Sequence, residues 1–363
     1  MSNAQHFTLF VMLGLLLSAC GSNEDQVGTP GTPVAGTTST TTTTLGGVAG
    51  TPGTPVAGYA LGTVQEINQV CSPGATGVSC RTLEVSCPDL PPLSVELRIS
   101  EPTTGTTNRG TIIFSTGSGG TGFYYLAAAD LFKSLQDLGF RLIDRKWVSS
   151  WFDGGQGVRK GACRYATLAT WIHDNLHDTD TDTDTAFCAT GNSGGAAEVG
   201  HAMVTYGREA IFDYAMPTGG PAVARLDYAC LGKTNEAWLT QCAALISTSA
   251  WECLPTGTLP DCFISPLDGV CVALNPVPTE EELLSDSVLA PDGVYHFPRT
   301  KMGFIEGTED CQVSPVMGIL FHNTVESLKT LQFVQDTPHV VSSAPLGRAA
   351  MVQTLNADCV LRH

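Results

Sequence analysis

The stretch Cys188-Ala-Thr-Gly-Asn-Ser-Gly-Gly-Ala-Ala197 contains the single GxSxG motif of the chain, with Ser193 at its centre. The apolar residues 186–189 predict a buried strand, and the small residues 194–206 predict a helix. So sharp a turn from strand to helix forces strained dihedral angles on the serine, and glycines two positions away on each side remove Cβ atoms that would collide. The hydroxyl is then expected to stand exposed beside a helix N-terminus, where developing negative charge is favoured. The stretch therefore predicts a nucleophilic serine.

Strand and helix signals alternate on both sides of this motif. The predicted strands are 110–115, 140–148, 186–189, 210–216, 301–305 and 331–335, and the predicted helices are 124–138, 162–176, 194–206, 315–328 and 346–361. Repeated strand–helix units predict an α/β fold with a mostly parallel central sheet and helices on both faces. Residues 219–298 interrupt the alternation with five cysteines, and a capping box of Thr279 and Glu282 predicts a short helix within them.

Two later segments carry polar residues directly after predicted strands. Phe304-Ile-Glu-Gly-Thr-Glu-Asp-Cys-Gln-Val-Ser-Pro315 has acidic residues at the end of one strand, and Asp336-Thr-Pro-His-Val-Val341 has a histidine after the next. Together with GxSxG, and in this chain order, the segments resemble the α/β-hydrolase family. The likeness covers roughly residues 92–363. It implies the α/β-hydrolase fold, with 219–298 as a cysteine-rich cap insertion that either controls substrate access or only stabilises the domain.

The resemblance also implies a catalytic role for three residues. Ser193 would attack a carbonyl carbon, His339 would take its proton as general base, and Asp310 would orient the imidazole and stabilise its protonated form. Glu309 is the neighbouring alternative for the acid, and Cys311 is positioned to fasten this loop by a disulfide. The leading hypothesis is a carboxylic ester hydrolase that works through an acyl-enzyme. A serine peptidase of the same fold and a non-catalytic surface-binding lipoprotein are the alternatives.

An oxyanion hole needs two backbone N–H donors. In the family one donor is the residue after the nucleophile, here Gly194, and the other comes from a loop after an early strand. The matching loop is Ser115-Thr-Gly-Ser-Gly-Gly-Thr121, in which Thr116-Gly117 stands where many esterases have His-Gly. Ser118 is therefore the expected second donor, with Gly119 as its alternative. The loop lacks the GK[ST] ending of a phosphate-binding loop.

Two aromatic residues follow the predicted strand 140–148. Trp151 and Phe152 lie at a strand end, so they are candidates for lining the acyl or alcohol pocket, with simple packing as the alternative.

The N-terminal region predicts export and a lipid anchor. Residues 7–17 are an apolar run of the length of a signal-peptide core, and Leu17-Ser-Ala-Cys-Gly21 resembles the bacterial lipobox, although no Lys or Arg precedes the run. We expect a lipoprotein signal peptide at 1–19 and lipidation of Cys20. An ordinary secretory signal is the alternative.

A tether precedes the catalytic domain. Residues 20–62 are rich in Gly, Thr and Pro and contain the nonapeptide GTPGTPVAG twice. Such a segment has few of the large apolar side chains that offset ordering entropy, so it is predicted to be a flexible spacer. Residues 63–363 would then form one catalytic domain.

The net charge limits the classes of partner that the protein can bind, and the number of cysteines indicates the compartment in which it folds. The 363 residues include 18 Lys+Arg and 35 Asp+Glu, and the net charge of −17 argues against a nucleic-acid partner. Thirteen cysteines are too many for a typical reduced enzyme, and twelve remain for disulfides if Cys20 is lipidated. We expect an extracytoplasmic protein of the bacterial cell envelope, attached to a membrane by its anchor or else secreted, with an ester as its substrate.

No cofactor is predicted. Asp178-Thr-Asp-Thr-Asp-Thr-Asp184 spaces carboxylates at alternate positions, but Thr183 and Ala189 stand where a calcium loop of the EF-hand type has Gly and Glu. A solvated acidic loop is the expectation, with structural Ca²⁺ as the alternative. His173 and His177 are four residues apart on a predicted helix, but a third metal ligand is missing.

Overall fold

The computed structural model describes residues 53–72, 77–177, 185–231, 271, 278–312 and 314–361. The predicted signal peptide, Cys20, most of the tether and the acidic run Asp178–Asp184 lie outside the described residues. Within the described part of the chain, no helix has both the length and the apolar character needed to span a bilayer.

One mixed sheet organises the described residues. Its strands are β1 (Thr63–Asn68), β2 (Ser79–Ser86), β3 (Leu93–Ser100), β4 (Gly110–Ser115), β5 (Phe140–Trp147), β6 (Ala186–Asn192), β7 (Tyr214–Thr218), β8 (Lys301–Gly307) and β9 (Lys329–Val334). They lie in the order β1-β2-β3-β5-β4-β6-β7-β8-β9. The pairs from β1 to β5 along this order are antiparallel, and every pair from β5 to β9 is parallel. The predicted mostly parallel sheet is therefore confirmed.

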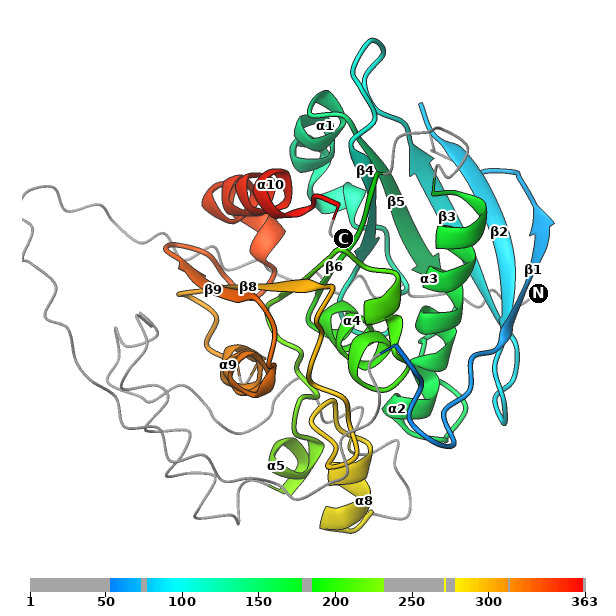
Figure 1. Cartoon of the computed structure of the whole chain (residues 1–363), viewed down its shortest axis with the longest axis vertical. Coiled ribbons are helices and arrows are strands. Elements are labelled where there is room, and N and C mark those ends of the chain that lie inside the picture. Colours follow the sequence, from blue (N-terminus) through cyan, green and yellow to red (C-terminus); the bar gives the residue numbers. More distant parts are fainter. Residues whose placement is uncertain are drawn as a thin grey trace, which may run out of the picture. The chain divides into compact units, whose positions relative to one another are not determined.

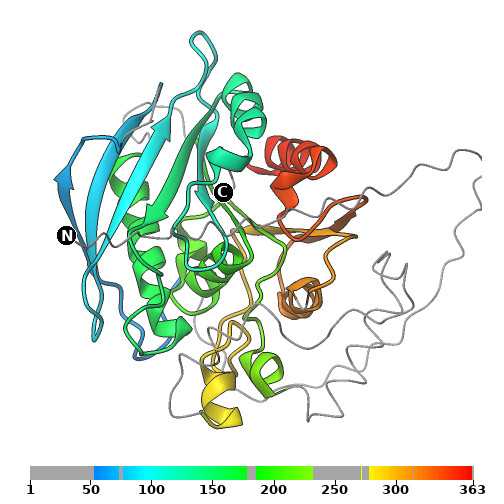
Figure 2. The ribbon, with the colours of Figure 1, turned by 180° about the vertical axis from the view of Figure 1, so that it is seen from behind.

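Helices cover both faces of the sheet (Figures 1 and 2). They are α1 (Ala129–Asp137), α2 (Val158–Gly161), α3 (Cys163–Asn175), α4 (Gly194–Val204), α5 (Leu226–Leu231), α8 (Glu280–Ser285), α9 (Ser314–Thr324) and α10 (Pro345–Asp358), with short 3-10 turns at Tyr125–Ala127, Arg208–Ala210 and Val341–Ser343. α1 and α10 lie together on one face, and α3, α4 and α9 lie on the other.

Alternation along the central strands divides the core between these two faces. Ile112 of β4 and Leu142 of β5 pack with the apolar residues of α1 and α10. Their chain neighbours Ile113 and Ile143 pack with those of α3 and α4. Successive side chains of a strand point to opposite faces, so continuous apolar strands bury both faces of the sheet.

Some predicted boundaries differ from the observed ones. The segment predicted as a helix over 124–138 is a 3-10 turn followed by α1, because Ala128 between them leaves the helical conformation, with φ −146° and ψ 39°. The backbone N–H groups of Tyr124 and Tyr125, at the start of the turn, donate to the buried Asp144 side chain. The strand predicted at 210–216 begins at Tyr214, after a 3-10 turn.

The cysteine-rich insertion is described in part. α5 and α8 pack together, a disulfide joins Cys230 to Cys271, and the predicted capping box of Thr279 and Glu282 is formed. Val288 of this insertion packs against Gly200 of α4. The described residues therefore show a disulfide-containing insertion beside α4.

The end of the predicted tether lies against the folded domain. Val56 N–H donates to the Thr205 carbonyl at 2.8 Å, and the Arg159 guanidinium lies 4.2 Å from the centre of the Tyr59 ring. The tether composition changes at Tyr59 and Leu61, the large apolar residues that pack on the core. Contact with the domain thus begins several residues before the predicted boundary at residue 63.

All nine cysteines of the described residues are disulfide-bonded. The described pairs are Cys71–Cys80, Cys87–Cys163, Cys188–Cys359 and Cys230–Cys271. Cys311, beside the predicted acid, is also disulfide-bonded, as expected for this loop.

Candidate active site

Ser193 occupies a strained turn between β6 and α4. Its φ of 55° and ψ of −111° fall outside the conformations that L-residues ordinarily adopt. A Cβ at Gly191 would collide with the Gly195 carbonyl, and a Cβ at Gly195 would collide with the Ser115 carbonyl. Both glycines are thus required by close backbone approach, as the motif predicts.

His339 and Asp310 meet at the carboxyl edge of the sheet. Asp310 follows β8 and is buried, and its Oδ2 lies 2.7 Å from Nδ1 of His339, which follows β9. This contact leaves the Nε2 nitrogen of the imidazole available on the other side of the ring. Glu309, the alternative acid, is exposed, and its backbone N–H donates to the Thr337 carbonyl.

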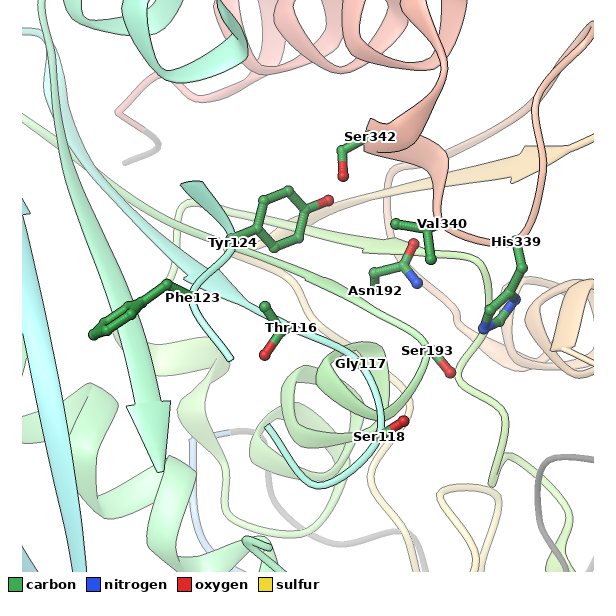
Figure 3. Close-up of a pocket in the computed structure, with 10 residues that line it drawn as sticks. All are labelled: Thr116, Gly117, Ser118, Phe123, Tyr124, Asn192, Ser193, His339, Val340 and Ser342. Carbon is green, nitrogen blue, oxygen red and sulfur yellow. The ribbon is translucent and has the colours of Figure 1, made fainter. Parts of the chain in front are cut away.

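Ser193 and His339 line the same cavity, which has a volume of about 290 Å³. Figure 3 shows the two side chains next to each other at one end of it. The residues that line the cavity are Thr116, Gly117, Ser118, Phe123, Tyr124, Asn192, Ser193, His339, Val340 and Ser342. The structure therefore brings the predicted nucleophile, base and acid into one site.

The two expected oxyanion donors also lie together. Ser118 lines the cavity and has a φ of 51°. The Gly194 backbone approaches Ser118 so closely that a Cβ at Gly194 would collide with the Ser118 carbonyl. A Cβ added to Gly117 would lie 3.2 Å from the Ser193 Cβ. The glycine-rich loop thus runs directly beside the predicted nucleophile, Ser193.

Trp151 and Phe152 pack in the interior, which is the alternative that the sequence left open for them. Neither is among the residues that line the cavity. Trp151 is 1% exposed, and its indole Nε1 donates to the Ser118 carbonyl at 3.1 Å. Phe152 packs against the core and contacts the Trp151 ring edge-on. Trp151 therefore supports the glycine-rich loop from behind.

Several cavity residues were not identified from the sequence. Tyr124 and Ser342 are buried, and Figure 3 shows the Tyr124 hydroxyl directed towards Ser342. Asn192 was inside the quoted motif, but GxSxG allows any residue at this position. Tyr124 is the first residue of a helix that the sequence predicts as continuous over 124–138, so no local signal set it apart.

Buried carboxyl groups surround the site. Burial, and to a smaller extent the charge of Asp310, raise the pKa of Glu306 well above its ordinary value, although its Oε1 accepts from the Gly220 N–H at 3.2 Å. Burial also raises the pKa of Asp144, which holds the start of the segment containing Tyr124, to about 7. Glu306 therefore favours its neutral form, which limits the negative charge beside Asp310.

Three further histidines, His173, His177 and His201, have structural surroundings. His201 is fully buried in α4, and burial lowers its pKa to about 3. The rings of His173 and His177 stack 5.7 Å apart. Among the described residues, no group of three or more His, Cys, Asp or Glu is arranged to hold a metal ion.

Comparisons with known proteins give structural similarity at low identity. No known protein-family model matches the sequence, and no curated protein matches it. Est1E from Butyrivibrio proteoclasticus is 12% identical, and the match covers 76% of this chain and 96% of that one with a TM-score of 0.44. An acetyl xylan esterase from Paenibacillus sp. R4 is 13% identical, with 84% and 89% covered and a TM-score of 0.49. A dienelactone hydrolase from Anabaena variabilis is 15% identical, with 79% and 100% covered and a TM-score of 0.43.

The strand order of the sheet and the turns that follow its strands identify the fold. Antiparallel strands at one edge lead into a parallel sheet, a strained serine turn follows the central strand β6, and a glycine-rich loop follows β4 beside it. An acid then follows β8 and a histidine follows β9. This arrangement of strands and turns is the α/β-hydrolase fold, and the chain has it.

Proposed function

We propose that this protein is a serine hydrolase that cleaves carboxylic esters through an acyl-enzyme on Ser193. The observation that carries the proposal is the 2.7 Å contact between His339 Nδ1 and Asp310, because it directs the other imidazole nitrogen to a cavity that Ser193 also lines. The strained turn that exposes the serine adds support.

The proposed reaction has two halves. Ser193 Oγ attacks the ester carbonyl carbon while His339 Nε2 accepts its proton, and Asp310 stabilises the imidazolium that forms. The tetrahedral intermediate collapses when the C–O bond to the alcohol breaks, and the alcohol leaves with the proton from His339. Water then attacks the acyl-enzyme with the same base, which releases the acid and restores the serine. Backbone N–H groups of Ser118 and Gly194 would bind the oxyanion in both halves.

The volume of the cavity favours substrates with a small acyl group. A volume of about 290 Å³ is at the lower end of ligand pockets, and its lining mixes apolar and hydroxyl-bearing side chains. We expect acetyl to butyryl esters to be hydrolysed faster than long-chain esters.

A panel of p-nitrophenyl esters and peptide anilides tests the function. The expected result is ester turnover that Ser193→Ala abolishes, with slower turnover of anilides. Faster cleavage of the anilides would favour a peptidase. Ester turnover that survives in Ser193→Ala would overturn the mechanism, and no turnover by the wild type on any substrate would favour a non-catalytic binding protein.

We further propose that the enzyme is extracytoplasmic and lipid-anchored through Cys20. The nine disulfide-bonded cysteines of the described residues support an oxidising compartment. Metabolic labelling with a radioactive fatty acid in a bacterial host is expected to mark the wild type and leave Cys20→Ala unlabelled. Equal labelling of both proteins would contradict the anchor site.

A further inference from the structure

A buried ion pair lies behind the glycine-rich loop 116–120. We propose that Arg145 and Glu198, together with Trp151, are positioning residues that fix the backbone of this loop for binding the oxyanion. The inference rests on the proposed function and extends it to residues that do not line the cavity.

Every carbonyl group of the loop accepts a hydrogen bond. The acceptors and donors are Thr116 O from Arg145 Nη2 (3.4 Å), Gly117 O from Gly120 N (3.1 Å), Ser118 O from Trp151 Nε1 (3.1 Å), Gly119 O from Trp151 N (3.0 Å), and Gly120 O from Arg145 Nη1 (2.8 Å) and Trp147 N (3.0 Å). Four of the five carbonyls are therefore held from β5 or from the residues that follow it.

Holding a carbonyl also directs the next N–H group. A peptide unit is planar and trans, so its C=O and N–H groups point in opposite directions. The hydrogen bond to Gly117 O consequently orients the N–H of Ser118. The bond from Trp151 to Ser118 O likewise orients the N–H of Gly119. These are the two N–H groups that the sequence nominates as oxyanion donors from this loop.

The ion pair connects this loop to the nucleophile helix. Glu198 lies in α4, the helix that begins directly after Ser193, and pairs with Arg145 where both side chains are 0% exposed. Trp147 Nε1 donates to the second Glu198 oxygen at 2.7 Å. Arg145 thus contacts α4 and the loop at once, which fixes the donors of the loop relative to the N–H of Gly194.

The path of the loop accommodates the guanidinium. Gly120 has a φ of 72°, and a Cβ at this position would collide with Arg145 Nη1. Buried ion pairs contribute little net stability compared with apolar packing of the same volume. A pair that also organises backbone next to a nucleophile is better explained by positioning than by stability.

Arg145→Lys and Trp151→Phe test the proposal without leaving a buried charge unpaired. Lysine keeps the charge but cannot span Gly120 O and Thr116 O, and phenylalanine removes the donor to Ser118 O while it keeps an aromatic ring, although a smaller one, at this buried position. We expect kcat for a p-nitrophenyl ester to fall about 10- to 100-fold with KM within about threefold. The inhibition constant of a trifluoromethyl ketone, which forms a tetrahedral adduct, should rise by the same factor as kcat/KM falls.

Amide hydrogen exchange of the peptide covering 116–121 gives a readout that needs no turnover. Both variants should exchange this peptide about tenfold faster than the wild type while the core strands stay protected. Arg159→Lys is the matched control, because Arg159 is also buried and pairs with Asp292, but it contacts no residue of the loop among its hydrogen bonds. It should change neither kcat nor the exchange of the loop.

Two results would overturn the inference. One is unchanged exchange of the loop in folded Arg145→Lys and Trp151→Phe. The other is faster exchange with unchanged kcat and unchanged affinity for the trifluoromethyl ketone, which would make the contacts purely structural. A wild type that hydrolyses no ester but shows the loop effect would instead contradict the proposed function, so the two failures are distinguishable.

Discussion

Asn192 and Val341 are joined directly, although 149 positions separate them in the chain. The side-chain Oδ1 of Asn192 accepts a hydrogen bond of 3.2 Å from the Val341 backbone N–H. Asn192 immediately precedes Ser193, and Val341 follows His339 by two residues. The same oxygen also accepts from Thr218 Oγ1 at 3.1 Å. The buried side-chain amide of Asn192 therefore connects the turn that carries Ser193 to the loop that carries the proposed base, His339.

Removal of this amide should impair catalysis. We expect Asn192→Ala to lower kcat about 10- to 100-fold, because the histidine loop loses its attachment and an unsatisfied buried N–H group costs about 1–3 kcal/mol. Asn192→Asp keeps the acceptor and should retain more activity than Asn192→Ala. Asn323→Ala, at an exposed position on α9, is the control. Steady-state kinetics on one ester would contradict the role if Asn192→Ala stayed within twofold of the wild type.

The choice between the two candidate acids can be tested by paired amide substitutions. Asp310→Asn should lower kcat about 10³- to 10⁴-fold, because an amide in contact with His339 Nδ1 no longer stabilises the imidazolium. Glu309→Gln should leave kcat within about twofold, since Glu309 is exposed and contributes its backbone N–H instead. The reverse order of effects in ester hydrolysis would assign the acid to Glu309.

Asp144 should make stability depend on pH. Burial raises its pKa to about 7, although the hydrogen bonds from the Tyr125 and Tyr124 N–H groups act in the opposite direction. The folded state therefore keeps a proton that the unfolded chain loses near pH 4. Its contribution to the free energy of unfolding is present at low pH and is lost as pH rises through about 7. The free energy of unfolding should fall by up to about 1.4 kcal/mol for each pH unit in this range.

Urea unfolding between pH 4.5 and 8 measures this slope. Asp144→Asn should be less stable overall, because one acceptor oxygen is lost, but its stability should decrease less with rising pH than that of the wild type. An identical slope in both proteins would show that Asp144 does not titrate in this range.

The disulfide between Cys188 and Cys359 should stabilise the fold more than the one between Cys71 and Cys80. The first joins β6 to the end of α10 with a sequence separation of 171, and the second has a separation of 9. Chain-entropy arguments give about 5 kcal/mol for the long loop and about 3 kcal/mol for the short one. Paired Cys→Ser variants, compared by thermal unfolding, test the order. Equal losses of stability in the two variants would mean that loop-closure entropy does not determine how much each disulfide stabilises the fold.

The central strands and helices could be predicted because their signals are local. The apolar segments 110–115 and 301–305 read as strands, and small residues after Ser193 read as a helix. The antiparallel strands β1, β2 and β3 were not predicted, although Leu93-Ser-Val-Glu-Leu-Arg-Ile99 alternates apolar and polar residues with a period of two. That signal was present in the sequence.

The supporting contacts of the site could not be predicted in the same way. Arg145 and Glu198 are 53 positions apart and meet only because β5 and α4 are brought together by the sheet. Trp151 stands at a strand end in the sequence, but whether it faces the cavity or the back of the loop depends on the path of the chain after β5. Pairings of this kind are decided by tertiary packing and leave no local pattern.

Labelling with a fluorophosphonate, followed by mass spectrometry of the peptides, tests the proposed nucleophile most directly. The reagent phosphonylates serines that are activated by a neighbouring base. We predict one adduct per chain, located on Ser193, absent from Ser193→Ala and formed far more slowly in His339→Ala. An unmodified Ser193 in the folded wild type, or an adduct on a different serine, would contradict the assignment.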